Sequence, residues 1–186
     1  GSSRIHISRK GEGKYLPESN NIDICISTYH GEEYKYNSPI SLCVYDVENK
    51  SLGSLSNLKS ANSLIYILAS IYARENNFDN AILLNSSACI IEATNANIFI
   101  VKNQKIYTPS LSEGCVDGTM RKLVINWLDI FETVISIDQV LDAEEIFITN
   151  ATSGIVSVKI IEETYFKSFN MARSIQEKLI NLSLDF

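Results

Sequence analysis

Short apolar runs and alternating patterns recur along the chain and predict many short β-strands. In the stretch IDICISTY, Ile22, Ile24 and Ile26 fall on one face, as expected for a strand with one apolar side. Comparable runs are RIHIS, ISLCVYDV, NAILLN, ACIIEA, ANIFIVKN, QKIYTP, AEEIFITN and GIVSVKII. Gly, Pro, Asn and Ser separate many of these runs, which favours turns between them.

Three segments instead carry the three- and four-residue spacing of amphipathic helices. The first covers residues 62–76, and the second covers residues 119–133, where Trp127 and Phe131 are predicted on an apolar core face. The third covers residues 165–183. Because strands and helices are mixed and hairpins are frequent, the pattern favours an antiparallel-rich α/β (α+β) domain over a doubly wound parallel sheet.

Composition and charge argue against some classes of binding partner. The chain has 186 residues and a formal net charge of −6, without a run of clustered Lys and Arg. We therefore expect neither nucleic acid nor an anionic membrane as a main partner, because phosphate binding requires clustered cations. No apolar stretch is long enough for a transmembrane helix, and no segment resembles a signal peptide, so a cytoplasmic location is predicted.

Cysteine and histidine usage argues against a metal site. The four cysteines lie far apart, no C-x-x-C motif occurs, and only His6 and His30 are present. We expect no zinc site and no disulfide framework. We expect the cysteines to be buried, reduced thiols and the histidines to lie at the surface.

Three features in order suggest a shared chemistry. They are Lys59 at a loop-to-helix boundary, Glu92 at a strand end, and the glycine-containing loop 114–121 before a helix. Each alone is typical of a solvated side chain or a turn. Together they meet the needs of pyridoxal phosphate, which requires a lysine amine, an acid beside its ring nitrogen and backbone N–H groups around its phosphate.

The sequence around these features resembles the class IV aminotransferase family of pyridoxal-phosphate enzymes, also called fold type IV. The resemblance rests on LKSANSL, on E-x-x-x-x-N-I-F followed by TP, and on G-x-x-x-G-x-x-R, and it spans about Arg4 to Ser183. The family includes branched-chain and D-amino-acid aminotransferases and 4-amino-4-deoxychorismate lyase. It implies an antiparallel-rich pseudo-barrel with flanking helices, an amino-acid-like substrate and a homodimer.

The resemblance also assigns residue roles. Lys59 matches the Schiff-base lysine, which also moves the substrate's α-proton, and Glu92 matches the acid that binds the pyridine nitrogen. Asn97 matches an asparagine that supports the turn after Glu92, and Arg121 is expected to be structural. The residues expected at the cofactor phosphate are Gly118, Thr119 and Met120 in one loop, with Ala151 and Thr152 in a second loop.

Family members carry a further N-terminal segment that is not in this sequence. The resemblance implies that residues 1–35 are a remnant of a smaller α/β domain and that residues 36–186 form the cofactor-binding domain. We expect the chain to be a fragment, with a short natural relative as the alternative. A fragment could keep Lys59 and Glu92 and still be inactive.

The lysine motif favours one branch of the family. Leu64 stands five residues after Lys59, where branched-chain aminotransferases usually carry tyrosine. The motif K-x-x-N-x-L resembles the lyase and the D-amino-acid enzymes, and the TNA of residues 149–151 resembles the lyase. The leading hypothesis is 4-amino-4-deoxychorismate lyase, which eliminates pyruvate to leave 4-aminobenzoate for folate synthesis. The alternatives are an aminotransferase for D- or branched-chain amino acids with 2-oxoglutarate, and a non-catalytic relative.

Overall fold

The computed structural model describes residues 2–12, 15–30 and 33–184. The chain divides into two compact units, Gly1–Glu33 and Tyr34–Phe186. Whether the first unit is the remnant of a smaller domain, with a boundary at residue 35, stays a prediction. None of the helices in the described ranges is long and apolar enough to cross a membrane.

The first unit contains an antiparallel hairpin of β1 (Ser2–Arg9) and β2 (Ile22–Tyr29). Ile5 pairs with Ile26 and Ile7 pairs with Ile24. Directly paired residues share a face of an antiparallel pair, so these isoleucines form one apolar face, as the alternation predicted. Each of them is more than half exposed within this chain.

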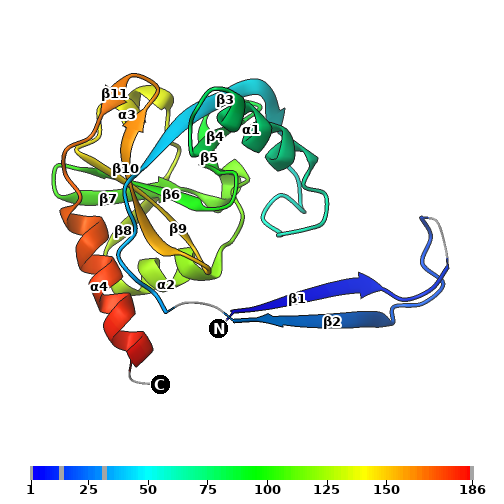
Figure 1. The fold of residues 1–186 in the computed structure, drawn as a ribbon. Helices are drawn as coiled ribbons and strands as arrows, with labels where there is room; N and C mark the ends of the chain where they lie inside the picture. The colour runs from blue at the N-terminus through cyan, green and yellow to red at the C-terminus, as the bar shows by residue number, and fades with distance from the viewer. Residues whose placement is uncertain (1, 13–14, 31–32, 185–186) are drawn as a thin grey trace. The chain divides into compact units, whose positions relative to one another are not determined.

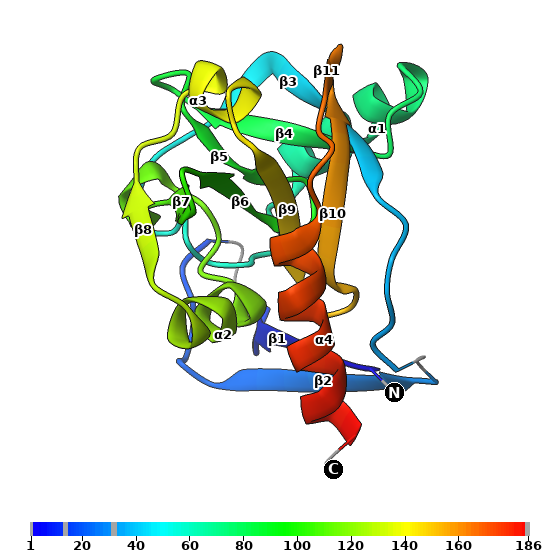
Figure 2. The same cartoon turned by 90° about the vertical axis from the view of Figure 1, so that its left-hand side faces the viewer.

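The second unit is built on one strongly curled mixed sheet (Figures 1 and 2). The strand order is β5-β4-β3-β10-β9-β6-β7-β8, and β11 pairs with β10. The strand bounds are β3 Ile40–Lys50, β4 Asn80–Asn85, β5 Ile90–Ala93, β6 Asn97–Lys102, β7 Lys105–Pro109, β8 Ile130–Thr133, β9 Glu145–Asn150, β10 Gly154–Ile161 and β11 Thr164–Tyr165. A bridge between Ala93 and Ala96 joins β5 to β6, so the sheet curls into a half-barrel.

In the described part of this unit, four α-helices and one 3-10 turn accompany the sheet. They are α1 (Leu64–Glu75), α2 (Thr119–Trp127), α3 (Ile137–Leu141), α4 (Asn170–Leu184) and η1 (Leu111–Glu113). Helix α1 lies against β3 and β4, while α4 lies against β9 and β10 (Figure 1). The mixed α/β fold class predicted from the sequence is confirmed.

The central strands are apolar on both sides because both faces are covered. On β6, Ile98 and Ile100 belong to the core enclosed by the curled sheet, whereas Phe99 packs with residues of α2 and α4. On β4, Leu83 packs toward α1 while Ile82 belongs to the enclosed core. This double coverage explains why these strands read as short continuous apolar runs.

The second predicted helix is wrong in its last part. Helix α2 ends at Trp127, Leu128 has an extended backbone, and residues 130–133 form β8, which pairs in parallel with β7. Phe131 lies opposite Tyr107 in this pairing and is 41% exposed, so its predicted core position is also wrong. Ile130, Phe131 and Thr133 favour strands, and β7 offers an edge for them to pair with.

The cysteines match the expectation only in part. All four are free, and Cys43 and Cys115 are buried, as predicted. Burial raises the pKa of both thiols to about 11. Cys25 is exposed on β2, opposite His6, so its predicted burial is wrong.

Candidate active site

A cavity of about 640 Å³ opens beside the predicted lysine. It is lined by the end of β3, the loop before α1 and the start of α1. One residue of the turn after β5 and one residue of the loop before α2 complete the lining. The lining includes Lys50, Lys59, Tyr66, Thr94 and Val116. This volume is in the range of small-molecule and cofactor sites, about 300–1,000 Å³.

A β-bulge at Ile91 sets the direction of Glu92. Leu84 pairs with Ile90 and Leu83 pairs with Glu92, so Ile91 is an extra residue in β5. Because the bulge shifts the alternation by one residue, Glu92 shares a face with Leu83, which packs toward α1. Glu92 is therefore buried under the cavity lining, with 3% of its surface exposed, rather than directed to solvent.

Three donors hold the Glu92 carboxylate. Lys50 Nζ and the Tyr66 hydroxyl each donate to Oε1 at 2.7 Å, and the Val116 N–H donates to Oε2 at 2.9 Å. Burial, reinforced by the Glu92 carboxylate, raises the pKa of Tyr66, so its hydroxyl remains a donor. A carboxylate has about four lone-pair positions, so Oε2 keeps one for a further N–H donor.

Lys59 is exposed at the cavity, and its amine forms no hydrogen bond or ion pair with any residue that the structure describes. Its loop is nevertheless held in place by Asn57. Asn57 Nδ2 donates to the carbonyls of Leu111 and Cys115 at 2.8 and 2.7 Å, and the Asn57 carbonyl accepts the Asp117 N–H. The lysine loop is thus fixed to the segment that carries Val116.

The predicted phosphate loop lies at the start of α2. Gly118 is the N-cap and provides no side-chain cap, so the N–H groups of Thr119 and Met120 have no partner within the helix. Both groups, together with the positive end of the helix dipole, suit an anion. The nearby Asp117 carboxylate is paired with Lys122 at 2.7 Å, which reduces its repulsion of such an anion.

Asn97 connects this helix start to the end of β9. Its Nδ2 donates to the Val116 carbonyl at 2.7 Å, and it pairs with Thr149 across β6 and β9. Asn97 therefore supports the segment before α2, while the role expected for it at the turn after Glu92 stays a prediction. The Thr149 hydroxyl beside it is buried and has no hydrogen-bond partner among the described residues.

The second predicted phosphate loop is the turn between β9 and β10. Ala151 and Thr152 are both exposed there. The Thr152 N–H already donates to Asn150 Oδ1 at 2.9 Å, so the Ala151 N–H and the Thr152 hydroxyl are the groups left for a ligand. Arg121, by contrast, is 2% exposed and binds the Pro109 carbonyl and Glu132, which fits its expected structural role.

Gly118 has a steric requirement that leads to a prediction. A Cβ at this position would lie 2.1 Å from Asn97 Oδ1. We expect Gly118→Ala to displace Asn97 from Val116 and to lower the free energy of unfolding by about 1–3 kcal/mol, the cost of an unsatisfied buried polar group. Urea denaturation measures this change, with Gly53→Ala, which meets nothing within 4 Å, as the matched control. Equal stability of the two variants would contradict the assignment.

Sequence reasoning missed Lys50, Tyr66 and Asn57. A tyrosine on the buried side of a helix needs a partner for its hydroxyl, which is a signal that could have directed attention from Tyr66 to Glu92. Lys50 gives no local signal, because its contact depends on the position of β3 beside β4. No cluster of three or more potential metal ligands occurs in the part of the chain that the structure describes.

Comparison with known proteins identifies similar chains. The family model described as amino-transferase class IV matches residues 1–161. The aminodeoxychorismate lyase of Vibrio harveyi is 31% identical over 109 residues, which are 56% of this chain and 40% of that protein. The matched part is less than half the length of the curated relatives.

Solved structures match the fold over nearly the whole chain. The 4-amino-4-deoxychorismate lyase of Pseudomonas aeruginosa superposes with a TM-score of 0.87 at 20% identity, covering 99% of this chain and 72% of that one. A branched-chain aminotransferase of Thermoproteus uzoniensis gives a TM-score of 0.85 at 20% identity, covering 97% and 65%. At this identity the likeness establishes the fold alone.

Proposed function

We propose, from the premise that this chain belongs to the class IV aminotransferase family, that its cavity binds pyridoxal phosphate and acts on an amino-acid-like substrate. The observation that carries the proposal is the buried Glu92 carboxylate, held by three donors beneath a cavity that also contains the unpaired amine of Lys59. When bound, the cofactor supplies an aldehyde for covalent attachment and a ring that withdraws electrons from the α-carbon of the substrate.

Glu92 provides the negative charge for the ring nitrogen. Its remaining lone pair on Oε2 is suited to accept an N–H from the ring, and a nearby anion favours the protonated nitrogen. Lys50, Tyr66 and the Val116 N–H hold the carboxylate in position without using that lone pair. Burial keeps water away from the carboxylate, which strengthens its electrostatic effect.

Lys59 provides the amine. It has no competing partner among the described side chains, whereas Lys50 is committed to Glu92 at 2.7 Å. Of these two lysines at the cavity, Lys59 is therefore free to attach to the aldehyde and afterwards to take and return a proton at the α-carbon. Asn57 fixes the Lys59 loop, which limits the range of positions that the amine explores.

The phosphate is assigned to the N–H groups of Thr119 and Met120 after Gly118, with Ala151 and Thr152 as the second group. The support is the uncapped start of α2 together with the Thr149 hydroxyl of β9, which has no hydrogen-bond partner among the described residues. An anion at this position would satisfy helix N–H groups that otherwise depend on solvent. Arg121 does not take part, because its guanidinium binds Pro109 and Glu132.

Within the family, we propose pyruvate elimination from 4-amino-4-deoxychorismate as the reaction. Asn62, the asparagine of the lyase-like K-x-x-N-x-L motif, lines the cavity with Lys59. Leu64, which stands where branched-chain aminotransferases usually have tyrosine, is 64% exposed. Because the motif resembles both the lyase and the D-amino-acid enzymes, these two positions favour either of them over transamination of branched-chain amino acids. The choice of the lyase over the D-amino-acid enzymes rests on the lyase-like TNA of residues 149–151.

A product assay tests this choice. With pyridoxal phosphate and 4-amino-4-deoxychorismate, we expect pyruvate and 4-aminobenzoate to form without any added amino acceptor. L- and D-amino acids with 2-oxoglutarate serve as the alternative substrates in parallel reactions. Formation of keto acid that depends on 2-oxoglutarate, without pyruvate release from 4-amino-4-deoxychorismate, would replace the lyase by an aminotransferase.

A further inference from the structure

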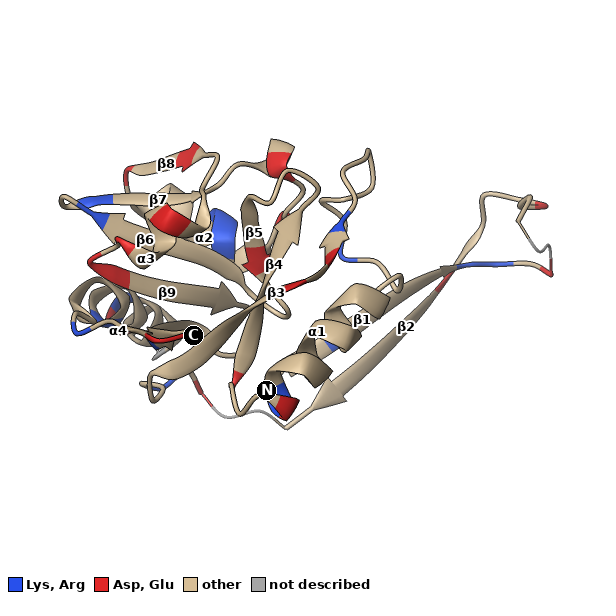
Figure 3. Cartoon of the chain, turned by 90° about the horizontal axis from the view of Figure 1, so that it is seen from above, with Lys and Arg blue, Asp and Glu red and all other residues tan. Residues whose placement is uncertain are grey.

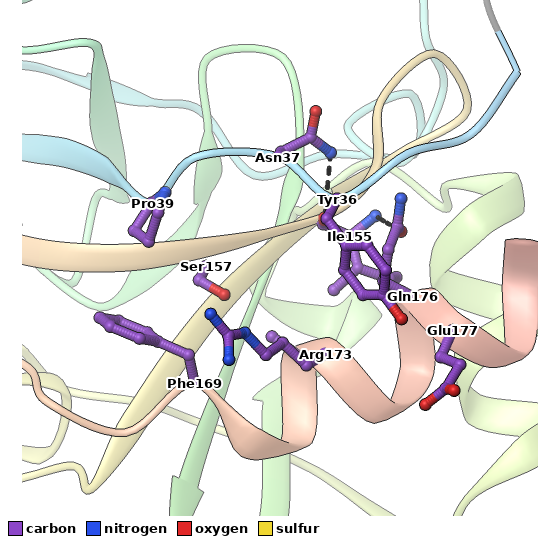
Figure 4. Close-up of a pocket in the computed structure, with 10 residues that line it drawn as sticks. Tyr36, Asn37, Pro39, Ile155, Ser157, Phe169, Arg173, Gln176 and Glu177 are labelled. Atoms are coloured by element: carbon purple, nitrogen blue, oxygen red, sulfur yellow. Dashed lines mark hydrogen bonds between the residues drawn. The ribbon is translucent and has the colours of Figure 1, made fainter.

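A second cavity lies outside the candidate active site. This cavity, which we call the α4 cavity, has a volume of about 390 Å³ and lies between α4, the first half of β10 and residues 36–39 (Figure 4). It shares no lining residue with the cavity beside Lys59. No part of the proposed reaction uses it.

The floor of the α4 cavity is buried, and part of its wall is apolar or aromatic. Ile155, Ala172 and Gln176 are each less than 4% exposed and lie beneath it. The rings of Tyr36 and Phe169 and the ring of Pro39 also line the space. Such a lining suits a small flat or branched apolar group.

Arg173 and Ser157 are two polar residues in the lining of the α4 cavity. The Arg173 guanidinium is directed toward Phe169 and the Ser157 hydroxyl, whereas the Glu177 carboxylate points the other way (Figure 4). Among the described residues, neither the Arg173 side chain nor the Ser157 side chain forms a hydrogen bond or ion pair. A guanidinium beside a hydroxyl matches the planar, two-oxygen geometry of a carboxylate.

The α4 cavity also adjoins the β9–β10 turn. Asn37 Nδ2 donates to the carbonyls of Ser153 and Ile155 at 2.9 and 3.3 Å, and the Tyr34 hydroxyl donates to the Ala151 carbonyl at 2.8 Å. Gln176 accepts the Ile155 N–H at 2.8 Å and donates to the Lys35 carbonyl. A molecule that contacts Asn37 and Gln176 would therefore change the surroundings of the turn amides.

We propose that the α4 cavity binds a small organic carboxylate, with its charged group on Arg173 and Ser157 and its apolar body between Tyr36, Pro39 and Phe169. The carboxylate accepts hydrogen bonds from the Arg173 guanidinium and the Ser157 hydroxyl, which have no partner among the described residues. The apolar body covers the surface of Ile155 and Ala172. This binding site is independent of the proposed cofactor chemistry.

Titration of the ¹⁵N-labelled chain with sodium benzoate, followed by amide NMR shifts, tests the site. We expect saturable shifts at residues 151–157 and in α4 around Ala172 to Gln176, with a dissociation constant on the order of 1 mM for a ligand of this size. Benzamide, which has the same shape without the charge, should bind at least about tenfold more weakly, because it loses the charge-assisted pair. No cofactor is needed, so the result does not depend on the proposed function.

Two variants complete the test. Arg173→Gln should weaken benzoate binding at least about tenfold, and it should remain folded because Arg173 is exposed. Arg74→Gln, which removes an exposed arginine from α1, should leave benzoate binding unchanged and controls for net charge. The proposal is overturned by shifts that do not saturate, by equal binding of benzoate and benzamide, or by unchanged binding in Arg173→Gln.

Discussion

Replacement of Lys59 by alanine is expected to abolish covalent attachment of pyridoxal phosphate and to lower turnover by at least about 10²–10⁴-fold, the contribution of a positioned acid–base group alone. The reason is that, among the residues that the structure describes, Lys59 supplies the cavity amine that no carboxylate engages, whereas Lys50 is held on Glu92. The measurement is borohydride reduction of the protein after incubation with pyridoxal phosphate, followed by mass mapping of the modified peptide. Lys105→Ala, at an exposed hairpin position, is the matched control and should still be labelled at Lys59.

The labelling experiment also shows which of the two lysines of the cavity, Lys50 or Lys59, attaches to the cofactor. Modification of Lys50 in the unaltered chain would mean that the ion pair with Glu92 opens readily and that the amine assignment is wrong. Stoichiometric labelling of Lys59→Ala at another position would have the same consequence. Attachment at Lys59 without turnover would keep the binding assignment and leave the missing chemistry to groups outside this chain.

Local sequence patterns were sufficient to predict most helices and strands of the fold. Strands with two covered faces appear as apolar runs, and α1 was predicted within two residues at its start and one at its end. The prediction failed between Leu128 and Thr133, where the helical spacing of the apolar residues continues. Pairing of β8 with β7 determines the structure there, and a contact between segments more than 20 residues apart cannot be inferred from local periodicity.

In the candidate site, too, some features follow from the local sequence and others depend on contacts between distant segments. Lys59 and Glu92 could be proposed as site residues because their sequence surroundings are distinctive. The direction of Glu92, in contrast, depends on the bulge at Ile91, which becomes visible only when β5 is paired with β4. Lys50 and Tyr66 come from β3 and α1 and meet Glu92 through the same packing, so neither could be assigned from spacing along the chain.

The other large effect is expected for Glu92→Gln. This change keeps the shape of the side chain but removes its charge, so Lys50, whose side chain is only 12% exposed, would lose its ion-pair partner. We expect the free energy of unfolding to fall by about 3–5 kcal/mol, the usual cost of removing one partner of a buried pair. Urea denaturation without cofactor measures this fall in the free energy of unfolding. Lys50→Met should be destabilising for the converse reason, because it leaves the Glu92 charge unpaired.

Combining the two changes distinguishes the structural role of Glu92 from its chemical one. Because each single variant leaves one buried group without its partner, the double variant Lys50→Met with Glu92→Gln should be less destabilised than the sum of the single variants. Turnover should nevertheless stay low in the double variant, since an amide cannot supply the negative charge that the ring nitrogen requires. Additive losses of stability would show that the pair at 2.7 Å contributes little to the fold. Recovery of turnover together with stability would show that Glu92 acts only by holding the site together, and the cofactor assignment of Glu92 would then be wrong.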